Sequence, residues 1–479
     1  MRYLVAYYKS LKFSPKSERT PTQEECLFDE AEYLIAAPEK PSNPETRIIK
    51  EHGRRVGGRK PFPEQIPREI IRHELKGEDK KCSCCGQELE EMSEEISEKL
   101  EIIPAKMIVK RHVRPKYACK SCLSDKKSKE FKMAPLPAEI LPKSIATASL
   151  FAHTLTNKFC DHLPYYRQEK IFQRFGIDIS RANLSNWQIQ FYEKYDRLEE
   201  LFWQDLLQNS VILADETPLQ VMREAERPNT RKSWMFVFAT QNIRFFQYRQ
   251  TRSAEFLADR FSNFKGTLAT DGFKSYDTLC RNLEIQHSGC WAHTRRKFFE
   301  VMKLSTGDSF AKEIVSKIRK LYEIEGKSRE RGSPPKILLK ERRKFSAVIV
   351  DEVFSLLKEK RGMVPASQPL GLAIHYAFAQ EAKLKVFLND ANVPIDTNQV
   401  ENAIRPFVLG RKNWLFSGSP RGADSSALVY SLIETAKVNG LEPWAYLNEL
   451  FEKLPHCQTT EEMSKLLPHR IVLDPNQKP

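Results

Sequence analysis

Three acidic residues stand in contexts where carboxylates can do chemistry. Asp215 ends the apolar run VILAD and Asp271 ends TLATD, both of strand length, whereas Glu401 lies in the helical stretch DTNQVENAIR. Carboxylates at strand ends in an α/β core point into the cleft where ligands bind, and a later helix can bring Glu401 over the same cleft. Three converging carboxylates can hold two Mg²⁺ or Mn²⁺ ions for in-line phosphoryl transfer. Taken singly, each acid is equally a turn residue, a helix cap or a surface charge.

The helix around Glu401 carries cations and an amide on the same face. At about 100° per residue, Asn398, Glu401 and Arg405 fall within an arc of roughly 60°, and Lys412 joins them if the helix continues. This grouping suits a metal ligand beside phosphate-binding cations. The alternative is a surface ion pair between Glu401 and Arg405. Pro406 lacks an N–H group and argues against a straight helix through this stretch, which bears on the alignment of Lys412.

Four cysteines in two C-x-x-C pairs predict a zinc site. Cys82 and Cys85, then Cys119 and Cys122, present paired thiolates of the kind that bind Zn²⁺ tetrahedrally. The sequence between the pairs includes KMIVKRHVRPKYAC, which alternates like a strand, so we expect a zinc ribbon with a β insertion. The alternative is four unrelated thiols, and Cys84 is a spare thiol that could replace Cys85.

The overall charge favours a polyanionic partner. The chain of 479 residues has 77 Lys and Arg against 63 Asp and Glu, a net charge of +14. This balance favours nucleic acid or an anionic membrane surface as partner. No apolar run approaches the ~18 residues of a membrane span, and the N-terminus lacks the features of a signal peptide. We therefore expect a cytoplasmic, nucleoid-associated protein with no membrane partner.

The elements that position these residues follow from apolar periodicity and turn signals. Within 144–200 we predict two helices separated at Gly176, with Ser180 as the N-cap of the second. This is the pattern of a helix-turn-helix that reads the major groove, although plain helical bundles share it. From 209 to 304, three strand-length runs precede alternating helices and strands, the order β-β-β-α-β-α-β-α of an RNase H-like fold. Asp396 or Thr397 is expected to cap the helix of Glu401.

We predict a multidomain α+β protein. An RNase H-like α/β catalytic core is interrupted by a helical insertion and preceded by a zinc ribbon and a helix-turn-helix-like helical domain. The predicted segments are an N-terminal arm or linker 1–75, the zinc ribbon 76–130, the helix-turn-helix-like DNA-binding domain 135–208, the first part of the core 209–304, the helical insertion 305–390, the last part of the core 391–423 and a C-terminal helical segment 424–479.

Several stretches together resemble the large DDE transposases of bacterial insertion-sequence-66 elements. They include ILADETPLQV, LATDGFKSYDTL, CWAHTRRKFFE and ENAIRPFVLGRKNWLFSG, in this order. The resemblance implies that Asp215, Asp271 and Glu401 form a DDE triad that uses two Mg²⁺ or Mn²⁺ ions, with Zn²⁺ in a structural role.

The same resemblance draws attention to His293, which lies in a stretch similar to the family's C-x2-H motif. Together with Cys290 it supplies too few ligands for a metal, so we expect contact with a substrate phosphate or packing. The candidate DNA contacts are His293, Arg295, Arg296, Arg405, Arg411, Lys412 and, beside them, Trp414.

The preferred hypothesis is a transposase that binds terminal inverted repeats, cleaves at the element ends and joins the freed 3′-hydroxyls to target DNA. A non-catalytic regulator built on the zinc ribbon and helix-turn-helix, and an RNase H-like nuclease without strand transfer, are the alternatives. Pairing two ends implies at least a homodimer. The resemblance adds small accessory proteins of the same element as possible partners.

Overall fold

The computed structural model describes residues 107–117, 132–253, 255–304 and 308–472, with six single residues between Glu69 and Lys99. The chain divides into two compact units, one of which comprises residues 37–136. In that unit, β1 (Lys116–Tyr117) and β2 (Lys132–Met133) form an antiparallel ribbon. The cysteines predicted to bind zinc, which are Cys82, Cys85, Cys119 and Cys122, lie outside the described residues.

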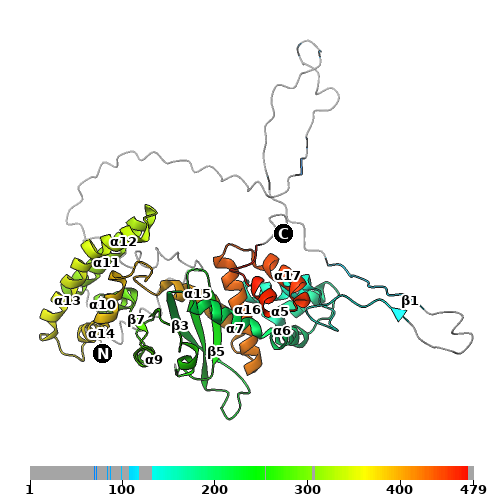
Figure 1. Cartoon of the computed structure of the whole chain (residues 1–479), viewed down its shortest axis with the longest axis horizontal. Helices are drawn as coiled ribbons and strands as arrows, with labels where there is room; N and C mark the ends of the chain where they lie inside the picture. Colours follow the sequence, from blue (N-terminus) through cyan, green and yellow to red (C-terminus); the bar gives the residue numbers. More distant parts are fainter. Residues whose placement is uncertain are drawn as a thin grey trace, which may run out of the picture. The chain divides into compact units, whose positions relative to one another are not determined.

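A five-stranded mixed sheet forms the core of the other unit (Figure 1). Its strands are β3 (Val211–Gln220), β4 (Lys232–Ala239), β5 (Arg244–Arg249), β6 (Thr267–Ala269) and β7 (Gln286–Ser288). Strands β3 to β5 pair antiparallel, β6 and β7 pair parallel, and the spatial order is β5-β4-β3-β6-β7. Helix α8 (Phe256–Arg260) precedes β6 and α9 (Lys274–Leu283) precedes β7. The order of elements predicted from the sequence is confirmed, and the fold is mixed α+β.

Two late helices cover the sheet. Helix α15 (Asn398–Trp414) packs against β3 and β4, and α16 (Pro420–Val438) packs against β5. Edge strands expose unpaired backbone groups that must find partners. On β5, the N–H of Phe246 donates to the hydroxyl of Ser431 at 2.8 Å, and the N–H of Arg244 donates to Thr435 at 2.9 Å. The hydroxyls of α16 therefore pair the edge that a sixth strand would otherwise occupy.

A helical group precedes the sheet in the sequence. It comprises α4 (Ala148–Phe159), α5 (Tyr165–Arg174), α6 (Arg181–Tyr195) and α7 (Arg197–Leu207). Gly176 separates α5 from α6 with a φ of +72°, and the Ser180 hydroxyl accepts the N–H of Asn183 at the start of α6. The predicted break and N-cap are both confirmed.

The core of this helical group is completed by the end of the chain. Helix α17 (Pro443–Lys453) packs on α4, and the chain continues through η4 (Leu454–His456) and α18 (Thr460–Lys465). The ring of Phe451 lies 4.7 Å from that of Phe151 and 5.1 Å from that of Phe191. Aromatic pairs at these separations contribute beyond their buried area, so the two ends of this unit share one core.

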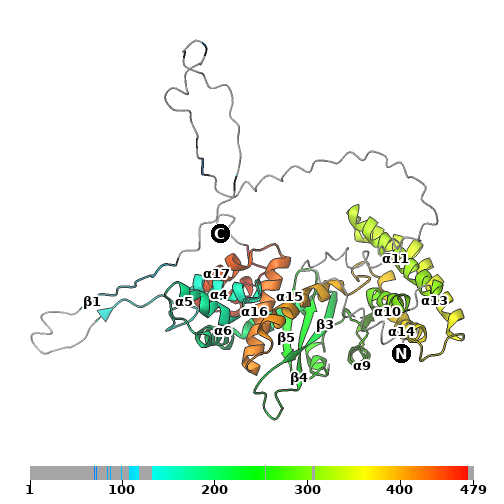
Figure 2. The same cartoon turned by 180° about the vertical axis from the view of Figure 1, so that it is seen from behind.

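Between β7 and α15 the chain forms a second helical group, seen from behind in Figure 2. Its helices are α10 (Trp291–Leu304), α11 (Ser309–Glu330), α12 (Pro335–Glu341), the π-helix η2 (Arg342–Ser346), α13 (Ala347–Arg361), α14 (Pro369–Leu384) and η3 (Val386–Leu388). Among the described residues, no helix is long and apolar enough to cross a membrane.

Arg342, in the π-helix, ties this group to the segment that leads into α15. Its side chain is 2% exposed and forms a bidentate ion pair with Glu325 at 2.7 and 2.8 Å. Its Nη1 atom donates to the carbonyl oxygens of Phe387, Asp390 and Val393 at 2.8–3.0 Å. A buried guanidinium is tolerated when its donors are satisfied in this way. The π-helix thereby fixes where the group sits relative to α15.

Pro406, which argued against a straight helix, does not interrupt α15. Helix α15 runs from Asn398 to Trp414 with Pro406 inside it. Proline removes one helical hydrogen bond, but buried residues precede and follow it, among them Ile404 and Phe407. Packing on the sheet at both sides of Pro406 holds the two halves as one helix.

Candidate active site

The pairing of β3 and β6 determines where two of the predicted acids lie. In the parallel ladder between these strands, Leu213 lies opposite Ala269. Asp215 lies two residues after Leu213, and Asp271 lies two residues after Ala269. The two acids therefore occupy equivalent positions along two neighbouring parallel segments of the same chain. Because side chains repeat every second residue along a strand, Asp215 points to the same face as Leu213. The register therefore brings these two carboxylates side by side beyond the end of β6.

Asp215 lies inside its strand rather than at the end that the sequence suggested. Strand β3 continues to Gln220 because β4 pairs with it antiparallel over its whole second half, with Asp215 opposite Val237. The shorter β6 stops at Ala269, which leaves one side of Asp215 without a strand neighbour. The prediction that the acid follows the end of its strand is correct for Asp271. Asp215 lies within β3, but just beyond the part of β3 that pairs with β6.

Glu401 is brought to this edge by α15. Thr397 is the N-cap residue, and the carboxylate of Asp396 accepts the N–H of Asn398 at 3.0 Å. This arrangement starts the helix at Asn398, three residues before Glu401. One oxygen of Glu401, Oε2, lies 3.4 Å from Nη2 of Arg296. The other, Oε1, is buried and has no hydrogen-bond partner in the part of the chain that the structure describes.

The neighbouring acids act electrostatically on Asp215, although the ligand atoms of Asp215, Asp271 and Glu401 do not all lie within 4.8 Å of one another. Burial is the first cause that raises the pKa of Asp215 to about 7, and the negative charges of Glu216, Asp271 and Glu401 raise it further. A carboxylate surrounded by other carboxylates is disfavoured in its charged form. The site therefore has an unbalanced negative charge that a cation would offset.

A fourth acid, Glu216, belongs to the same edge and was missed by sequence reasoning. Its carboxylate accepts hydrogen bonds from Arg252 at 2.6 Å and from the Tyr276 hydroxyl at 2.7 Å. These partners hold Glu216 as a paired structural acid beside Asp215. Its adjacency to Asp215 in the sequence was visible, but neither partner could be identified before the fold was known.

Glu401 also belongs to a second group of potential metal ligands. Within the described ranges, Cys290, His293 and Glu401 are the one set of three Cys, His, Asp or Glu residues whose ligand atoms all lie within 4.8 Å of one another. We call these three residues the Cys290 cluster. His293 Nδ1 is 3.5 Å from Glu401 Oε1, and neither atom forms a hydrogen bond. The N–H of Thr397 donates to Cys290 Sγ at 3.3 Å.

The Cys290 cluster fits a borderline-soft cation such as Zn²⁺. Two ligands about 2.0–2.1 Å from a tetrahedral zinc lie roughly 3.3 Å apart, close to the separation of His293 Nδ1 and Glu401 Oε1. Burial lowers the pKa of His293, which favours the neutral ring that binds metals. The sequence offered two ligands, and the third comes from a helix that follows more than 100 residues later.

The predicted DNA contacts divide into exposed and engaged side chains. Lys412 and Arg296 are exposed, and Arg405 is half-buried. Arg295 is 5% exposed, and Arg411 donates to Thr217 at 3.1 Å and to the carbonyl of Pro218. Buried or bound guanidinium groups of this kind position α10 and α15 rather than face solvent. Trp414 is likewise turned inward, with its ring 5.5 Å from that of Phe407.

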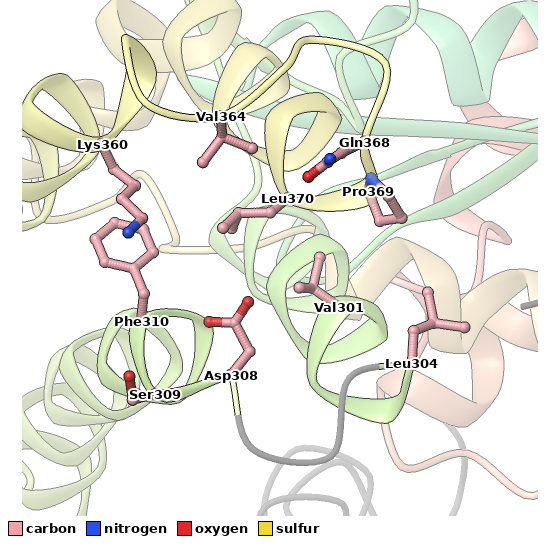
Figure 3. Close-up of a pocket in the computed structure, with 10 residues that line it drawn as sticks. All are labelled: Val301, Leu304, Asp308, Ser309, Phe310, Lys360, Val364, Gln368, Pro369 and Leu370. Atoms are coloured by element: carbon pink, nitrogen blue, oxygen red, sulfur yellow. The ribbon is translucent and has the colours of Figure 1, made fainter.

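A separate pocket of about 430 Å³ lies away from these acids, among α10, α11, α13 and α14 (Figure 3). Apolar side chains such as Val301, Leu304 and Leu370 line it, with Asp308 and Lys360 beside them. None of the predicted site residues takes part in its lining.

Comparison with known proteins identifies the family. The profile of the transposase IS66 family matches residues 143–425, that of the zinc-finger binding domain of transposase IS66 matches 79–122, and that of the IS66 C-terminal element matches 431–469. Uncharacterized protein y4jD of Sinorhizobium fredii is 31% identical, over 98% of this chain and 94% of its own length. Uncharacterized protein y4qI of the same organism is 29% identical, over 86% of this chain and 77% of its own length.

The chain therefore belongs to the IS66 family of transposases. The zinc-finger match spans all four cysteines of the two C-x-x-C pairs, and a zinc-finger domain indicates Zn²⁺ as a metal of this protein and DNA as its partner.

Proposed function

We propose that this chain is a DDE transposase that cleaves DNA at the ends of its element and joins the freed 3′-hydroxyls to target DNA. The observation that carries the proposal is the register of β3 and β6, which brings Asp215 beside Asp271. Glu401 lies close enough to this pair to raise the pKa of Asp215. These three residues are the proposed catalytic triad.

The arrangement of the strands supports an RNase H-like core. Three antiparallel strands are followed by two parallel strands on the far side of the first, in the order β5-β4-β3-β6-β7. In such a core, acids on the first and fourth strands meet at one edge, as Asp215 and Asp271 do. The helices α11 to α14 lie in the proposed insertion, residues 305–390, between the second and third acids.

The proposed triad fits hard divalent cations. Carboxylate oxygens are the ligands that Mg²⁺ and Mn²⁺ prefer, the three acids repel one another without a cation, and Glu401 Oε1 is buried without a hydrogen bond. When bound, a pair of such ions would activate the attacking water or 3′-hydroxyl and stabilise the leaving oxygen. The protein's own residues hold the acids in register, and exposed Arg296 and Lys412 supply positive charge for the DNA backbone.

We also propose that α5 and α6 form a helix-turn-helix that reads the element ends. The buried face of α6 contains Leu184, Trp187 and Phe191. Its exposed face presents Arg181, Asn186 and Gln190, the residue types that pair with base edges in the major groove. Binding two ends at once requires at least a dimer. We propose small accessory proteins of the same element as further partners.

The test is a strand-transfer assay with labelled element ends and Mn²⁺. We expect Asp271→Asn and Glu401→Gln to reduce cleavage at least ~100-fold because each removes a charged oxygen ligand, with end binding unchanged. Glu300→Gln is the matched control because Glu300 is an exposed acid of α10 outside the triad.

Each alternative gives a different result in this assay. Normal cleavage by the triad variants would refute the assignment of these acids. Cleavage by the unmodified protein without joined products would favour an RNase H-like nuclease. Binding without any nicking, with or without metal, would favour a DNA-binding regulator.

A further inference from the structure

Helices α11 to α13 form a long hairpin. The α12, η2 and α13 segments follow one another without interruption from Pro335 to Arg361 and fold back along α11. Two ion pairs define the direction: Lys317 binds Glu352 at 2.7 Å and Glu325 binds Arg342. The end of α11 therefore lies against η2, and the middle of α11 lies against α13, so α11 and the segment from α12 to α13 run antiparallel.

The closed end of this hairpin extends past the start of α10. Helix α10 has 14 residues and α11, which packs against it and begins a few residues later, has 22. Because a short connection joins them, α11 runs back along α10 as an antiparallel neighbour. The 14 residues of α10 are matched by the first 14 of the 22 in α11, so about eight residues of α11, or ~12 Å, extend beyond the start of α10. Figure 1 shows this end of the hairpin standing clear of α10. The start of α10 carries His293, which contacts Glu401, so the overhang lies on the side of the acidic site.

The overhanging end is strongly basic. Of the residues from 327 to 344, eight are Lys or Arg and two are Glu. Arg342 is buried against Glu325, and Arg331 pairs with Glu341 at 2.6 Å. The exposed cations are Lys327, Arg329, Arg331, Lys336, Lys340, Arg343 and Lys344. Positive charge of this density with few acids nearby is the electrostatic signature of a nucleic-acid-binding surface.

Three of these cations form a row along one helix face. Lys336, Lys340 and Arg343 are spaced i, i+4 and i+7, which places them on the same side of the helix. None of the three has a carboxylate partner among the residues that the structure describes. The row is about 10 Å long, and over that length a DNA duplex carries roughly six phosphate charges. Beside it, Ile337 and Phe345 are 47% and 48% exposed.

The row is rigidly connected to the segment that carries Glu401. Arg342 precedes Arg343 directly, and its five hydrogen bonds join the π-helix to α11 and to the carbonyls of Phe387, Asp390 and Val393. That segment continues into α15. A duplex held by the row is therefore held at a fixed place relative to the acids, which a mobile basic tail would not achieve.

We propose that the closed end of the hairpin, residues 327–344, is a binding surface for the sugar-phosphate backbone of double-stranded DNA that holds the duplex beside the acidic site. The proposal rests on the proposed function and adds a DNA contact outside both the zinc finger and the helix-turn-helix. A row of cations recognises phosphates and not base sequence, so element ends and unrelated duplexes are bound alike by it.

The test is the binding of a short labelled duplex of unrelated sequence by the full-length protein, followed by fluorescence anisotropy at several salt concentrations. The variant is Lys336→Glu/Lys340→Glu/Arg343→Glu. The matched control is Lys303→Glu/Lys312→Glu/Lys358→Glu, which changes the charge equally with exposed lysines at the other end of the same helical group.

We expect the hairpin variant to bind at least ~10-fold more weakly, with a salt-dependence slope smaller by about 2–3 because each lost phosphate contact contributes about 0.9. The control variant should keep the slope of the unmodified protein. Equal losses in both variants, or an unchanged slope in the hairpin variant, would overturn the proposal. If the charge-reversed hairpin fails to fold, the neutral variant Lys336→Gln/Lys340→Gln/Arg343→Gln must show the weaker binding.

The outcomes also separate this proposal from the proposed function. If the hairpin variant cleaves element ends and binds the duplex normally, the hairpin is not a DNA-binding surface, and the proposed transposase function stands. An unmodified protein that binds no duplex at all would reject both. Binding of an acidic protein in place of DNA, displaced by the same substitutions, would show that the surface serves another class of partner.

Discussion

The carboxylate of Asp215 destabilises the folded protein when it is ionised, so we predict that Asp215→Asn is more stable than the unmodified protein at alkaline pH. Its pKa is raised from 3.8 to about 7 on folding, and the folded state therefore disfavours the charged form. The cost is absent below about pH 4, grows between pH 4 and 7, and is constant above about pH 7. Asparagine keeps the oxygen that accepts the N–H of Glu216 at 2.8 Å and removes the charge.

The size of the effect follows from the same pKa values. Each pH unit between 3.8 and about 7 is worth about 1.36 kcal/mol, so the free energy of unfolding should increase by up to about 4 kcal/mol in Asp215→Asn. At about 2.1 cal/mol/K per residue, the entropy of unfolding of this chain is about 1 kcal/mol/K. Each kcal/mol therefore shifts the melting temperature by about 1 °C, and it should rise by about 4 °C at about pH 8. The difference should shrink as the pH falls to about 4.

The assay is thermal unfolding in a chelator across this pH range, with Asp178→Asn as control because Asp178 is an exposed acid between α5 and α6 and outside the triad. Millimolar Mg²⁺ should raise the melting temperature of the unmodified protein and not that of Asp215→Asn. Equal melting temperatures for the unmodified protein and Asp215→Asn in chelator at about pH 8 would show that the acids do not converge as described.

Two further predictions concern the π-helix and the Cys290 cluster. Arg342→Met leaves Glu325 buried without its cation and should lower the free energy of unfolding by about 3–5 kcal/mol. The control Arg343→Met changes an exposed residue and should alter the free energy of unfolding by less than ~0.5 kcal/mol. Urea unfolding measures both, and similar curves for the two variants would contradict the prediction. Zn²⁺ added to the Mg²⁺-supported cleavage reaction should inhibit it by occupying the Cys290 cluster, and Cys290→Ser should need at least ~10-fold more Zn²⁺ for half-inhibition because a hydroxyl replaces the thiolate ligand. Identical inhibition of both proteins would place the inhibitory ion elsewhere.

Local features of the fold were predictable because they depend on neighbouring residues. The break at Gly176 and the cap at Ser180 are set by backbone conformation and a hydroxyl group, and both follow from short-range rules. The alternation of strands and helices from 209 to 304 was visible as apolar runs of strand length. These signals require no knowledge of which elements pack together.

The site was predictable in its residue types and less so in its geometry. That β3 continues past Asp215 depends on β4 pairing alongside, and that α15 continues through Pro406 depends on the sheet beneath it. The engagement of Arg411 by β3 and the burial of Arg295 are likewise tertiary facts. A cation in a basic stretch has the same sequence appearance whether it faces solvent or a neighbouring strand.

The shared core of α4, α6 and α17 bears on how the protein is made. The rings of Phe151 and Phe191 are covered by Phe451, which the ribosome adds 260 residues after Phe191. Contacts of such sequence separation form late in folding, so the nascent helices that precede the sheet have no complete core until nearly the whole chain has emerged. We expect a chain that terminates before α17 to leave its first helices unfolded and open to proteolysis. Synthesis through to the final helices therefore acts as a checkpoint: we expect only a finished copy to hold both α5 and α6 and the acids in their folded positions.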